Sequence, residues 1–388
     1  MPARPPGLLL IGAQPPPHHG VTTVNETLIK SHRIREHFTV RHLDLSDRRP
    51  ISTVEKFDWQ NVWAALRHGT QGAWLMLAWR PRVIYLTISQ KTLGFLRDAL
   101  FLMPARLLGL KIVVHLHGGN FHNFYSHAAA PLRWLILFCL RRVGCAIVLG
   151  ENLRGCFDGV LPADRVAVLP NGIPDLAPPR AKQASKHDNE PLRVLYLGTV
   201  VTEKGIEVFL DAALRVLDRS EKWEFLVAGP WYRSEERQRL EAKARAHQRG
   251  SRITFVGEVA GNQKAELLCS CDIFVFPGIQ QEGLPLVTLE AMCAGLPVVA
   301  SAVGCLCEVI EEGVTGFLVP PGDATAVENR LQRLADDWVL CQQMGAAGRR
   351  RYEQLYRQEL FEERMTALFQ AVAAGDLRNI QNKLTPTG

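Results

Sequence analysis

The chain has 388 residues, enough for two domains, and its 47% hydrophobic and 22% charged residues exclude a mainly disordered protein. No stretch reaches the roughly 20 apolar residues that span a bilayer, and the apolar run at residues 8–11 is too short for a secretory signal, so we expect a cytoplasmic protein. The net charge of +6 is uneven, because residues 1–180 hold 21 Lys and Arg against 11 Asp and Glu, whereas residues 181–388 hold 24 against 28.

The first half of the chain alternates between strand and helix patterns. Short apolar runs typical of buried strands occur at residues 8–11, 83–86, 111–116 and 146–149, and helical spacing occurs at residues 24–32, 94–108 and 131–142. Buried strands separated by helices indicate a parallel sheet that is covered on both faces. We therefore predict a Rossmann-like domain over residues 1–176.

A polar, proline-rich stretch interrupts this pattern and predicts a linker at residues 177–191. The pattern then restarts, with strands at residues 193–197, 224–228, 253–256, 273–276 and 297–300 and a helix at residues 206–217. This predicts a second α/β domain over residues 192–355, followed by a helical segment at residues 356–388 that packs back on the first domain. Ligands bind at the carboxyl ends of the strands in such sheets.

The segment after the strand at residues 273–276 carries the strongest chemical signal. A loop with two glycines leads into a helix that begins near Pro285, and the first N–H groups of a helix are a natural seat for a diphosphate. Glu282 lies in the loop, and Glu290 lies eight residues later, more than one turn inside the helix. Each carboxylate is placed to accept hydrogen bonds from the vicinal hydroxyls of a sugar or a ribose. An exposed helix glutamate and an unrelated loop glutamate are the alternative.

Glu282 and Glu290 with their neighbours resemble the E-x7-E motif of the GT4-type retaining glycosyltransferases, also called glycosyl transferases group 1, which have the GT-B fold. The Leu-Glu-Ala-Met at residues 289–292 and the Gly-x-Pro-Val-Val-Ala at residues 295–300 match the same family pattern. The resemblance implies an α/β protein with two facing, doubly wound, Rossmann-like domains and a cleft between them. It also implies donor contacts from Glu282, Gly283, Leu284, Leu286, Val287 and Glu290.

A second segment of the later half supports the resemblance. Lys204, in the loop at residues 198–205, matches the family lysine that contacts the donor diphosphate, and a cation there would neutralise the departing nucleoside diphosphate. Thr199, also assigned to donor binding, stands where the family usually has arginine. This departure puts one of the two expected cationic contacts in doubt.

Two segments of the first domain match more weakly. Gly20 ends a proline-rich loop at residues 15–20 that resembles the family loop near the donor or acceptor, and a simple turn is the alternative. His117 follows the strand at residues 111–116 and resembles the family histidine near the transferred sugar, with a structural histidine as the alternative. The resemblance thus implies His117, Glu282 and Lys204 as catalytic residues.

The implied reaction is transfer of a sugar, with retention of anomeric configuration, from a UDP- or GDP-sugar to a hydroxyl acceptor in polysaccharide or glycolipid assembly. No cofactor and no metal is implied, the sequence has no Asp-x-Asp metal site, and no nucleic-acid-binding motif is evident. Two alternatives stay open: a nucleotide-sugar epimerase or hydrolase of the same architecture, and a catalytically silent nucleotide-sugar-binding protein.

Four tryptophans of the first domain lie near several arginines in the sequence. They are Trp63, Trp74, Trp79 and Trp134, and the arginines are Arg80, Arg82, Arg133, Arg141 and Arg142. A surface of this kind would hold a lipid-linked sugar acceptor at the inner face of a membrane. Tryptophans in a protein core are the alternative, and both interpretations stay open.

Overall fold

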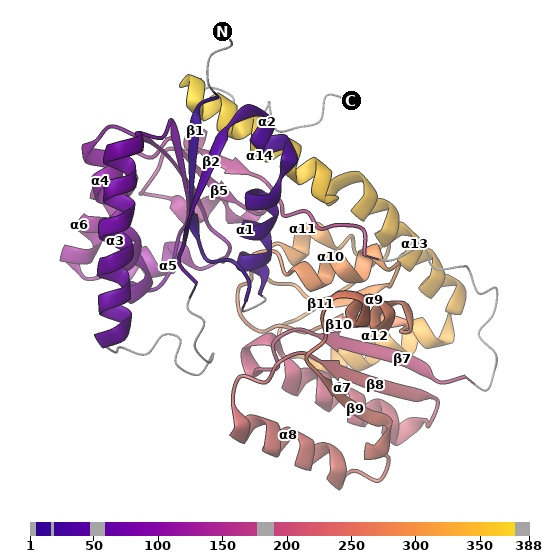
Figure 1. Cartoon of the computed structure of the whole chain (residues 1–388). Helices are drawn as coiled ribbons and strands as arrows, with labels where there is room; N and C mark the ends of the chain where they lie inside the picture. Colours follow the sequence, from indigo (N-terminus) through magenta and orange to yellow (C-terminus); the bar gives the residue numbers. More distant parts are fainter. Residues whose placement is uncertain (1–4, 17–18, 47–58, 177–189, 377–388) are drawn as a thin grey trace. The chain divides into compact units, whose positions relative to one another are not determined.

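The computed structural model describes residues 5–16, 19–46, 59–176 and 190–376, and the chain divides into two compact units (Figure 1). Unit 1 takes residues 1–172 and 358–388, and unit 2 takes residues 173–357. Each unit contains one six-stranded parallel sheet with helices around it, so the predicted α/β class is confirmed. Most of the predicted linker, residues 177–189, and residues 17–18 of the predicted proline-rich loop lie outside the described residues.

Unit 1 has the sheet order β2-β1-β3-β4-β5-β6. Its strands are β1 (Gly7–Gly12), β2 (Thr39–Asp44), β3 (Val83–Thr87), β4 (Lys111–His115), β5 (Cys145–Val148) and β6 (Val166–Val168). Its helices are α1 (Gly20–Lys30), α2 (His32–His37), α3 (Trp59–Trp79), α4 (Thr92–Leu107), α5 (Phe121–Ser126), α6 (Ala130–Leu140) and α14 (Gln358–Ala374). The order reverses beside β1, and ligands bind at such reversals, outside the carboxyl ends of the strands.

Local hydrogen bonds explain where the first helix of unit 1 begins. The sequence pattern suggested a helix at residues 24–32, but α1 begins at Gly20. The ring Nδ1 of His19 accepts from the N–H of Thr22 at 3.4 Å, and the Thr22 hydroxyl accepts from the N–H of His19 at 3.0 Å. This reciprocal cap satisfies two backbone donors and moves the helix start toward the end of β1.

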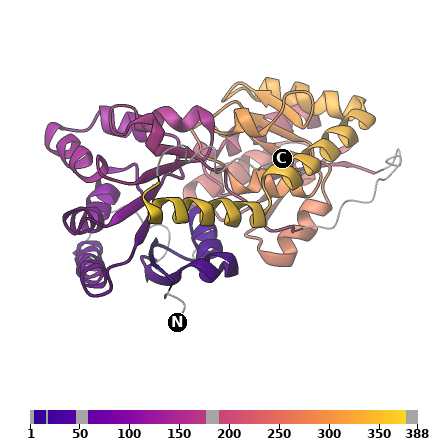
Figure 2. The ribbon, with the colours of Figure 1, turned by 90° about the horizontal axis from the view of Figure 1, so that it is seen from above.

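Helices cover both faces of the unit 1 sheet. In Figure 1, α3, α4 and α6 lie on one side of it, and α1, α2 and α14 lie on the other. Figure 2 shows α14, in yellow, running alongside the sheet, where it packs against α1, α2, β3 and β4. Phe369 of α14 meets Phe38 and Tyr85 edge-on, with ring centroids 6.2 and 5.9 Å apart. Burial of these rings holds the last described helix in unit 1.

Unit 2 has the sheet order β12-β11-β10-β7-β8-β9. Its strands are β7 (Leu192–Leu197), β8 (Trp223–Ala228), β9 (Ile253–Gly257), β10 (Ile273–Phe276), β11 (Val298–Ser301) and β12 (Gly316–Val319). Its helices are α7 (Ile206–Arg219), α8 (Ser234–Ala246), α9 (Gly261–Cys269), α10 (Leu286–Cys293), α11 (Leu306–Val309), α12 (Ala324–Asp336) and α13 (Trp338–Leu355). The order reverses between β7 and β10, so the loops after these two strands meet at the expected ligand-binding edge.

Polar contacts join the first residues of unit 2 to its last helix. The N–H of Ile173 donates to the carbonyl of Tyr356 at 3.0 Å, and the hydroxyl of Tyr352 donates to the carbonyl of Ile173 at 3.1 Å. The guanidinium of Arg349 binds the carboxylate of Asp175 at 2.5 Å. These contacts place residues 173–175 with α13, so the unit boundaries lie at 172/173 and 357/358, a few residues from those that the sequence suggested.

The length and composition of each helix decide whether it could cross a bilayer. In the described part of the chain, none combines the necessary length with a sufficiently apolar composition.

Candidate functional site

Two loops of unit 2 meet at the point where the strand order reverses. The loop after β7 contains Glu203 and Gly205, and the loop after β10 begins at Pro277. The N–H of Ile279 donates to the carbonyl of Glu203 at 3.1 Å. Gly205 has a φ of +81°, and a Cβ atom added to it would lie 1.9 Å from the carbonyl oxygen of Pro277. Only glycine fits this approach, because both the left-handed backbone and the short distance exclude a side chain.

The predicted catalytic residues Lys204 and Glu282 lie on these two loops and form an ion pair. The ammonium Nζ of Lys204 lies 2.5 Å from Oε1 of Glu282 and 5.9 Å from the centre of the Phe276 ring. Below them, the buried hydroxyl of Tyr196 lies 3.2 Å from the carbonyl of Thr199 and 3.4 Å from that of Lys204, within donating distance of both. A core side chain of unit 2 therefore fixes the backbone of the loop that carries Lys204.

A third loop holds the segment around Glu282 from another side. Gly304 has a φ of +51°, and an added Cβ atom would lie 1.8 Å from the carbonyl oxygen of Glu282. The N–H of Gly304 donates to the side chain of Gln281 at 3.0 Å, and the N–H of Cys305 donates to the carbonyl of Gly283 at 3.2 Å. The loop that carries Glu282 is thus positioned by backbone contacts from two neighbouring loops.

The helix α10 follows this loop directly and carries Glu290. Its first residue is Leu286, and Pro285 occupies the N-cap, where the missing N–H costs nothing. The side chains of Leu284 and Leu286 are buried, so contacts from them and from Val287 to a ligand would come from backbone N–H groups. The first N–H groups of a helix lack intrahelical partners and attract anions, which supports a diphosphate position at this end of α10.

Glu290 has a partner that the sequence analysis missed. Its side chain is 7% exposed, and its Oε1 lies 2.6 Å from the ammonium of Lys264. Its second oxygen, Oε2, is buried and has no hydrogen-bond partner among the described residues. A buried carboxylate oxygen without a partner is costly, and a ribose or sugar hydroxyl would satisfy it.

Lys264 could have been recognised by its position. It lies in the first turn of α9, which begins shortly after the carboxyl end of β9. A cation at a helix start after a parallel strand is a candidate ligand contact, because such helix starts line the binding edge of the sheet. Lys264 belongs to unit 2, as do Lys204 and both glutamates, so it adds a second cation to the predicted site in which Thr199 replaces the usual arginine.

The predicted residues of unit 1 also come together at the carboxyl end of its sheet. His117 follows β4, and His19 precedes Gly20 at the start of α1. Burial lowers the pKa of His117 to about 3, and the nearby charge of His19 adds to this shift. The Nε2 atom of His117 is buried without a hydrogen-bond partner among the described residues. At neutral pH the His117 ring therefore carries no charge. Its free Nε2 atom can still form a hydrogen bond with the hydroxyl of a bound ligand.

A series of buried polar side chains, linked by contacts and hydrogen bonds, lies against the His117 ring. The ring of His115 lies 4.0 Å from the ring of His117, between centroids, and burial lowers the pKa of His115 well below its usual value. Nδ1 of His115 lies 2.9 Å from the hydroxyl of Tyr85, which is 3.5 Å from Oδ1 of Asn25 on α1. Three elements thus fix one face of the His117 ring.

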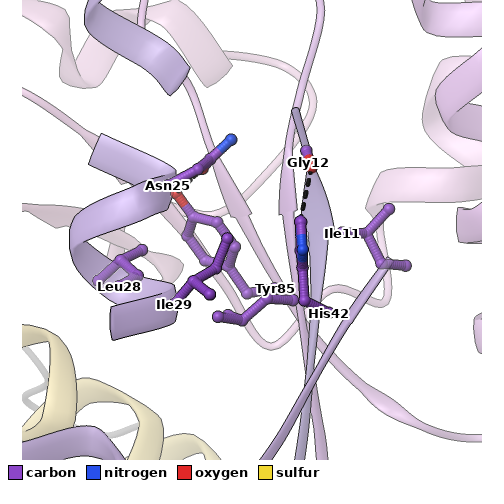
Figure 3. Close-up of a pocket in the computed structure, with 8 residues that line it drawn as sticks. Ile11, Gly12, Asn25, Leu28, Ile29, His42 and Tyr85 are labelled. Carbon is purple, nitrogen blue, oxygen red and sulfur yellow. Dashed lines mark hydrogen bonds between the residues drawn. The ribbon is translucent and has the colours of Figure 1, made fainter. Parts of the chain in front are cut away.

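A small hollow, partly lined by Tyr85 and Asn25, lies between α1 and the strands β1 to β3 (Figure 3). Nε2 of His42 forms a hydrogen bond with the carbonyl of Gly12 at 2.9 Å beside it. Its lining residues are Leu10, Ile11, Gly12, Asn25, Leu28, Ile29, His42 and Tyr85. None of the predicted site residues is among them, and no Lys or Arg is present to bind a phosphate.

The cysteines and histidines of the described ranges form neither disulfides nor a cluster that could bind a metal. All nine cysteines are free thiols. Within the described ranges, no three His, Cys, Asp or Glu side chains are grouped in a way that could hold a metal ion.

Residues 179–351 match the family model of glycosyl transferases group 1. The matched segment makes up most of unit 2, which is therefore similar to glycosyl transferases group 1. The matched segment contains Lys204, Glu282 and Glu290, and it also contains Lys264. The recognition made from the sequence is therefore confirmed at the level of the family.

Curated relatives match over part of their length. The chain is 27% identical over 258 residues to the alpha-D-kanosaminyltransferase of Streptomyces kanamyceticus, which covers 62% of this chain and 66% of that protein. It is 34% identical over 189 residues to the phosphatidyl-myo-inositol mannosyltransferase of Mycobacterium leprae, which covers 48% of this chain and 49% of that protein. The chain thus spans about half to two thirds of the length of these relatives.

Solved structures match over nearly the whole chain and show the fold. Anabaena HepE in complex with UDP has a TM-score of 0.72 and 16% identity, covering 94% of this chain and all of that one. Sucrose-phosphate synthase of Thermosynechococcus elongatus has a TM-score of 0.72 and 20% identity, covering 95% and 99%. Both units of the glycosyltransferase-like chain are Rossmann-like, as predicted for the GT-B fold. The predicted cleft between the units, which would join His117 and Gly20 to Lys204, stays a prediction.

A glycine substitution tests the contact between the two loops of unit 2. Gly205→Ala should lower the free energy of unfolding by more than Gly313→Ala, as measured by urea denaturation. Gly313 has a φ of +76° with no atom within 4 Å of an added Cβ, so its substitution costs only the roughly 1–2 kcal/mol of a left-handed backbone. Gly205→Ala adds a collision with Pro277. Equal losses in the two variants would mean that the loops do not touch as described.

The two buried histidines of unit 1 predict a dependence of stability on pH. Their pKa values are lowered by folding, so the unfolded chain binds protons below about pH 6.5 while folded His117 stays neutral until near pH 3. The free energy of unfolding should therefore fall as the pH is lowered from about 7 to about 4. The His117→Gln variant should show a smaller fall than wild type. Replacement of the exposed His32 by Gln is the control, and a slope in His117→Gln as steep as in wild type would contradict the account.

Proposed function

We propose that the protein is a retaining glycosyltransferase that moves a sugar from a UDP- or GDP-sugar to a hydroxyl acceptor in polysaccharide or glycolipid assembly. The observation that carries this proposal is the Lys204–Glu282 ion pair, 2.5 Å long, at the start of α10 in the family-matched unit. It combines an ammonium that can bind a diphosphate with a carboxylate that can accept hydrogen bonds from sugar hydroxyls. The start of α10, Glu290 and Lys264 support donor binding at the same place.

The proposed donor position follows from the charges around α10. The diphosphate would lie at the helix start, where backbone N–H groups and the ammonium of Lys204 stabilise its negative charge. The carboxylate of Glu282 would accept hydrogen bonds from the hydroxyls of the sugar. Glu290, held by Lys264, would accept from the ribose through its unpartnered oxygen.

The proposed chemistry needs no base from the protein. The bond between the anomeric carbon and the diphosphate oxygen breaks, and the acceptor oxygen bonds to the same carbon from the same face. The acceptor proton passes to the departing phosphate oxygen, so all charges balance. Lys204 and the α10 N–H groups stabilise the negative charge that grows on this leaving group, and no metal or cofactor is required. Neutral His117 would orient the sugar or the acceptor through a hydrogen bond.

The relatives guide the choice of substrates. HepE was solved with UDP and with UDP-glucose, which favours a UDP-sugar as the first donor to test. The Mycobacterium leprae relative is named for mannose transfer to phosphatidyl-myo-inositol, which favours a lipid-borne hydroxyl as acceptor. A lipid acceptor would place the protein in the cytoplasm at the inner face of a membrane.

A panel of nucleotide sugars tests the proposal. We expect one UDP- or GDP-sugar to raise the melting temperature and to release its nucleoside diphosphate when a suitable acceptor is present, with EDTA causing no loss. Product NMR should show the donor's anomeric configuration. Release of the nucleoside diphosphate without an acceptor would favour a hydrolase or epimerase. Binding of the nucleotide sugar without turnover would favour a catalytically silent binding protein. A product with inverted anomeric configuration would refute the retaining mechanism.

Variants of the ion pair test the roles of its two members. Lys204→Met and Glu282→Gln should each lower kcat by roughly 10²–10³-fold, because each removes charge stabilisation or positioning at the reacting centre. Because the two side chains contact each other, the double variant should lose less than the product of the two single losses. Steady-state kinetics with the identified donor measures these effects. Lys222→Met, an exposed lysine of the same unit, is the control and should behave as wild type. Normal kcat in either single variant would remove that residue from the site.

A further inference from the structure

Helix α3 of unit 1 has large apolar side chains on the outside and glycines on the inside. Its packed side contains Gly69 and Gly72, whose added Cβ atoms would lie 3.1 Å from Leu100 and 2.8 Å from Phe101 of α4. Its exposed side carries Trp59, Trp63, Leu66, Trp74 and Leu77, and the three tryptophans are 79%, 71% and 64% exposed. Hydrophobic burial alone would place tryptophans inward, so this arrangement calls for an apolar partner outside the unit.

The exposed side of α3 is a regular stripe. The spacing of its five apolar residues, with the exposed Thr70 between them, is four, three, four, four and three, which returns to one side of an α-helix. This places all of them along the same side of the helix, from its first residue, Trp59, to Leu77 near its end. The pattern is that of an amphipathic helix whose apolar side faces away from its own domain.

Two neighbouring helices extend the same apolar surface. Helix α4 packs against both α3 and α6, and it exposes Leu93, Leu96, Met103 and Leu107. Helix α6 exposes Trp134, whose ring stacks on Phe138 with centroids 5.3 Å apart. We name the exposed apolar residues of these three helices the tryptophan face: Trp59, Trp63, Leu66, Trp74, Leu77, Leu93, Leu96, Met103, Leu107 and Trp134. It contains ten of the fourteen large apolar side chains that are exposed in the described residues.

The exposed charges on the three helices of the tryptophan face have one sign. Residues 59–142 contain ten Lys and Arg but one acidic residue, Asp98. Asp98 is fully buried, where it binds the guanidinium of Arg97 at 2.8 Å and accepts from the N–H of Ser89 at 2.7 Å. The helices themselves carry Arg67, Arg97, Arg106 and Arg133 and no exposed carboxylate. The partner of this face must therefore be apolar and must also supply negative charge.

A second copy of the chain does not meet this requirement. Two tryptophan faces packed together would bring the arginines of both copies close to one another, and helices α3, α4 and α6 offer no exposed carboxylate to pair with them. The interface of an anionic bilayer supplies both components, because its acyl region receives tryptophan and leucine side chains and its headgroups neutralise arginine.

We infer that the tryptophan face docks on the surface of an anionic lipid bilayer. Helices α3, α4 and α6 lie on the membrane, with the tryptophans in the headgroup region and the arginines against lipid phosphates. The inference stands apart from the proposed transfer reaction, because none of its residues belongs to the donor site of unit 2. It answers the question that the sequence left open for Trp63, Trp74 and Trp134, which are not core residues.

Vesicle flotation tests the inference on the full chain. Wild type should float with phosphatidylcholine vesicles that contain about one third phosphatidylglycerol, and much less with pure phosphatidylcholine, at about 0.1 M salt. The double variant Trp63→Ser/Trp74→Ser should lose binding to the anionic vesicles by at least about tenfold, because two large apolar side chains no longer insert. Brominated lipids should quench tryptophan fluorescence in wild type more than in this variant.

Controls separate this result from the transfer reaction and from misfolding. The variant Val314→Ser/Val339→Ser removes two exposed apolar side chains of unit 2 and should float as wild type does. The tryptophan variant should keep the wild-type melting temperature and the wild-type shift with the nucleotide sugar, so loss of docking and loss of donor binding are distinguished. Equal flotation with both vesicle types, or unchanged flotation of the tryptophan variant, would overturn the inference. A wild-type dimer that the tryptophan variant dissociates, without flotation, would assign the face to a second copy instead.

Discussion

The ion pair between Lys204 and Glu282 depends on how closely two loops of unit 2 approach each other. The loops leave neighbouring parallel strands on either side of the point where the strand order reverses, and Gly205 allows the second to lie against the first. An ion pair near the surface contributes only about 0–1 kcal/mol to the free energy of unfolding. Its main effect here is therefore to position the two charged groups. It sets a carboxylate and an ammonium side by side at the start of a helix, where an anion and its hydroxyl-bearing neighbour can both be bound.

Much of this arrangement was predictable from the sequence, because the elements of unit 2 have strong local signals. The strand at residues 273–276 is a continuous apolar run, and the prolines and glycines after it fit only a loop and a helix start. Glu282 and Glu290 could be assigned to that loop and helix for this reason. The partners of the two glutamates were harder to predict, because Lys204 lies on another loop and Lys264 on helix α9, and only the strand order brings them near. The strand β2 was missed because it is an edge strand in which only Leu43 is buried and the other residues are exposed or half-buried.

Helix α3 shows a different limit of sequence reasoning. Its tryptophans suit a core or a membrane surface equally well from their hydrophobicity, and glycines within a helix give no indication of which side is packed. The structure separates the two interpretations, because Gly72 lies against the ring of Phe101 while Trp63 and Trp74 face outward. Only the packing against α4 decides which side of the helix is inside. Unit 1 therefore combines a polar site at the carboxyl end of its sheet with an apolar face on one helical layer.

Amide hydrogen exchange with and without the identified nucleotide sugar tests the central claim most directly. Our account predicts slower exchange in two separate segments of unit 2, residues 199–205 and residues 279–290, because the diphosphate and the sugar bind the two loops together with the start of α10. The surface turn around Gly313 should exchange at an unchanged rate. Protection confined to other segments of unit 2, with these two loops unaffected, would contradict the claim that they form the donor site.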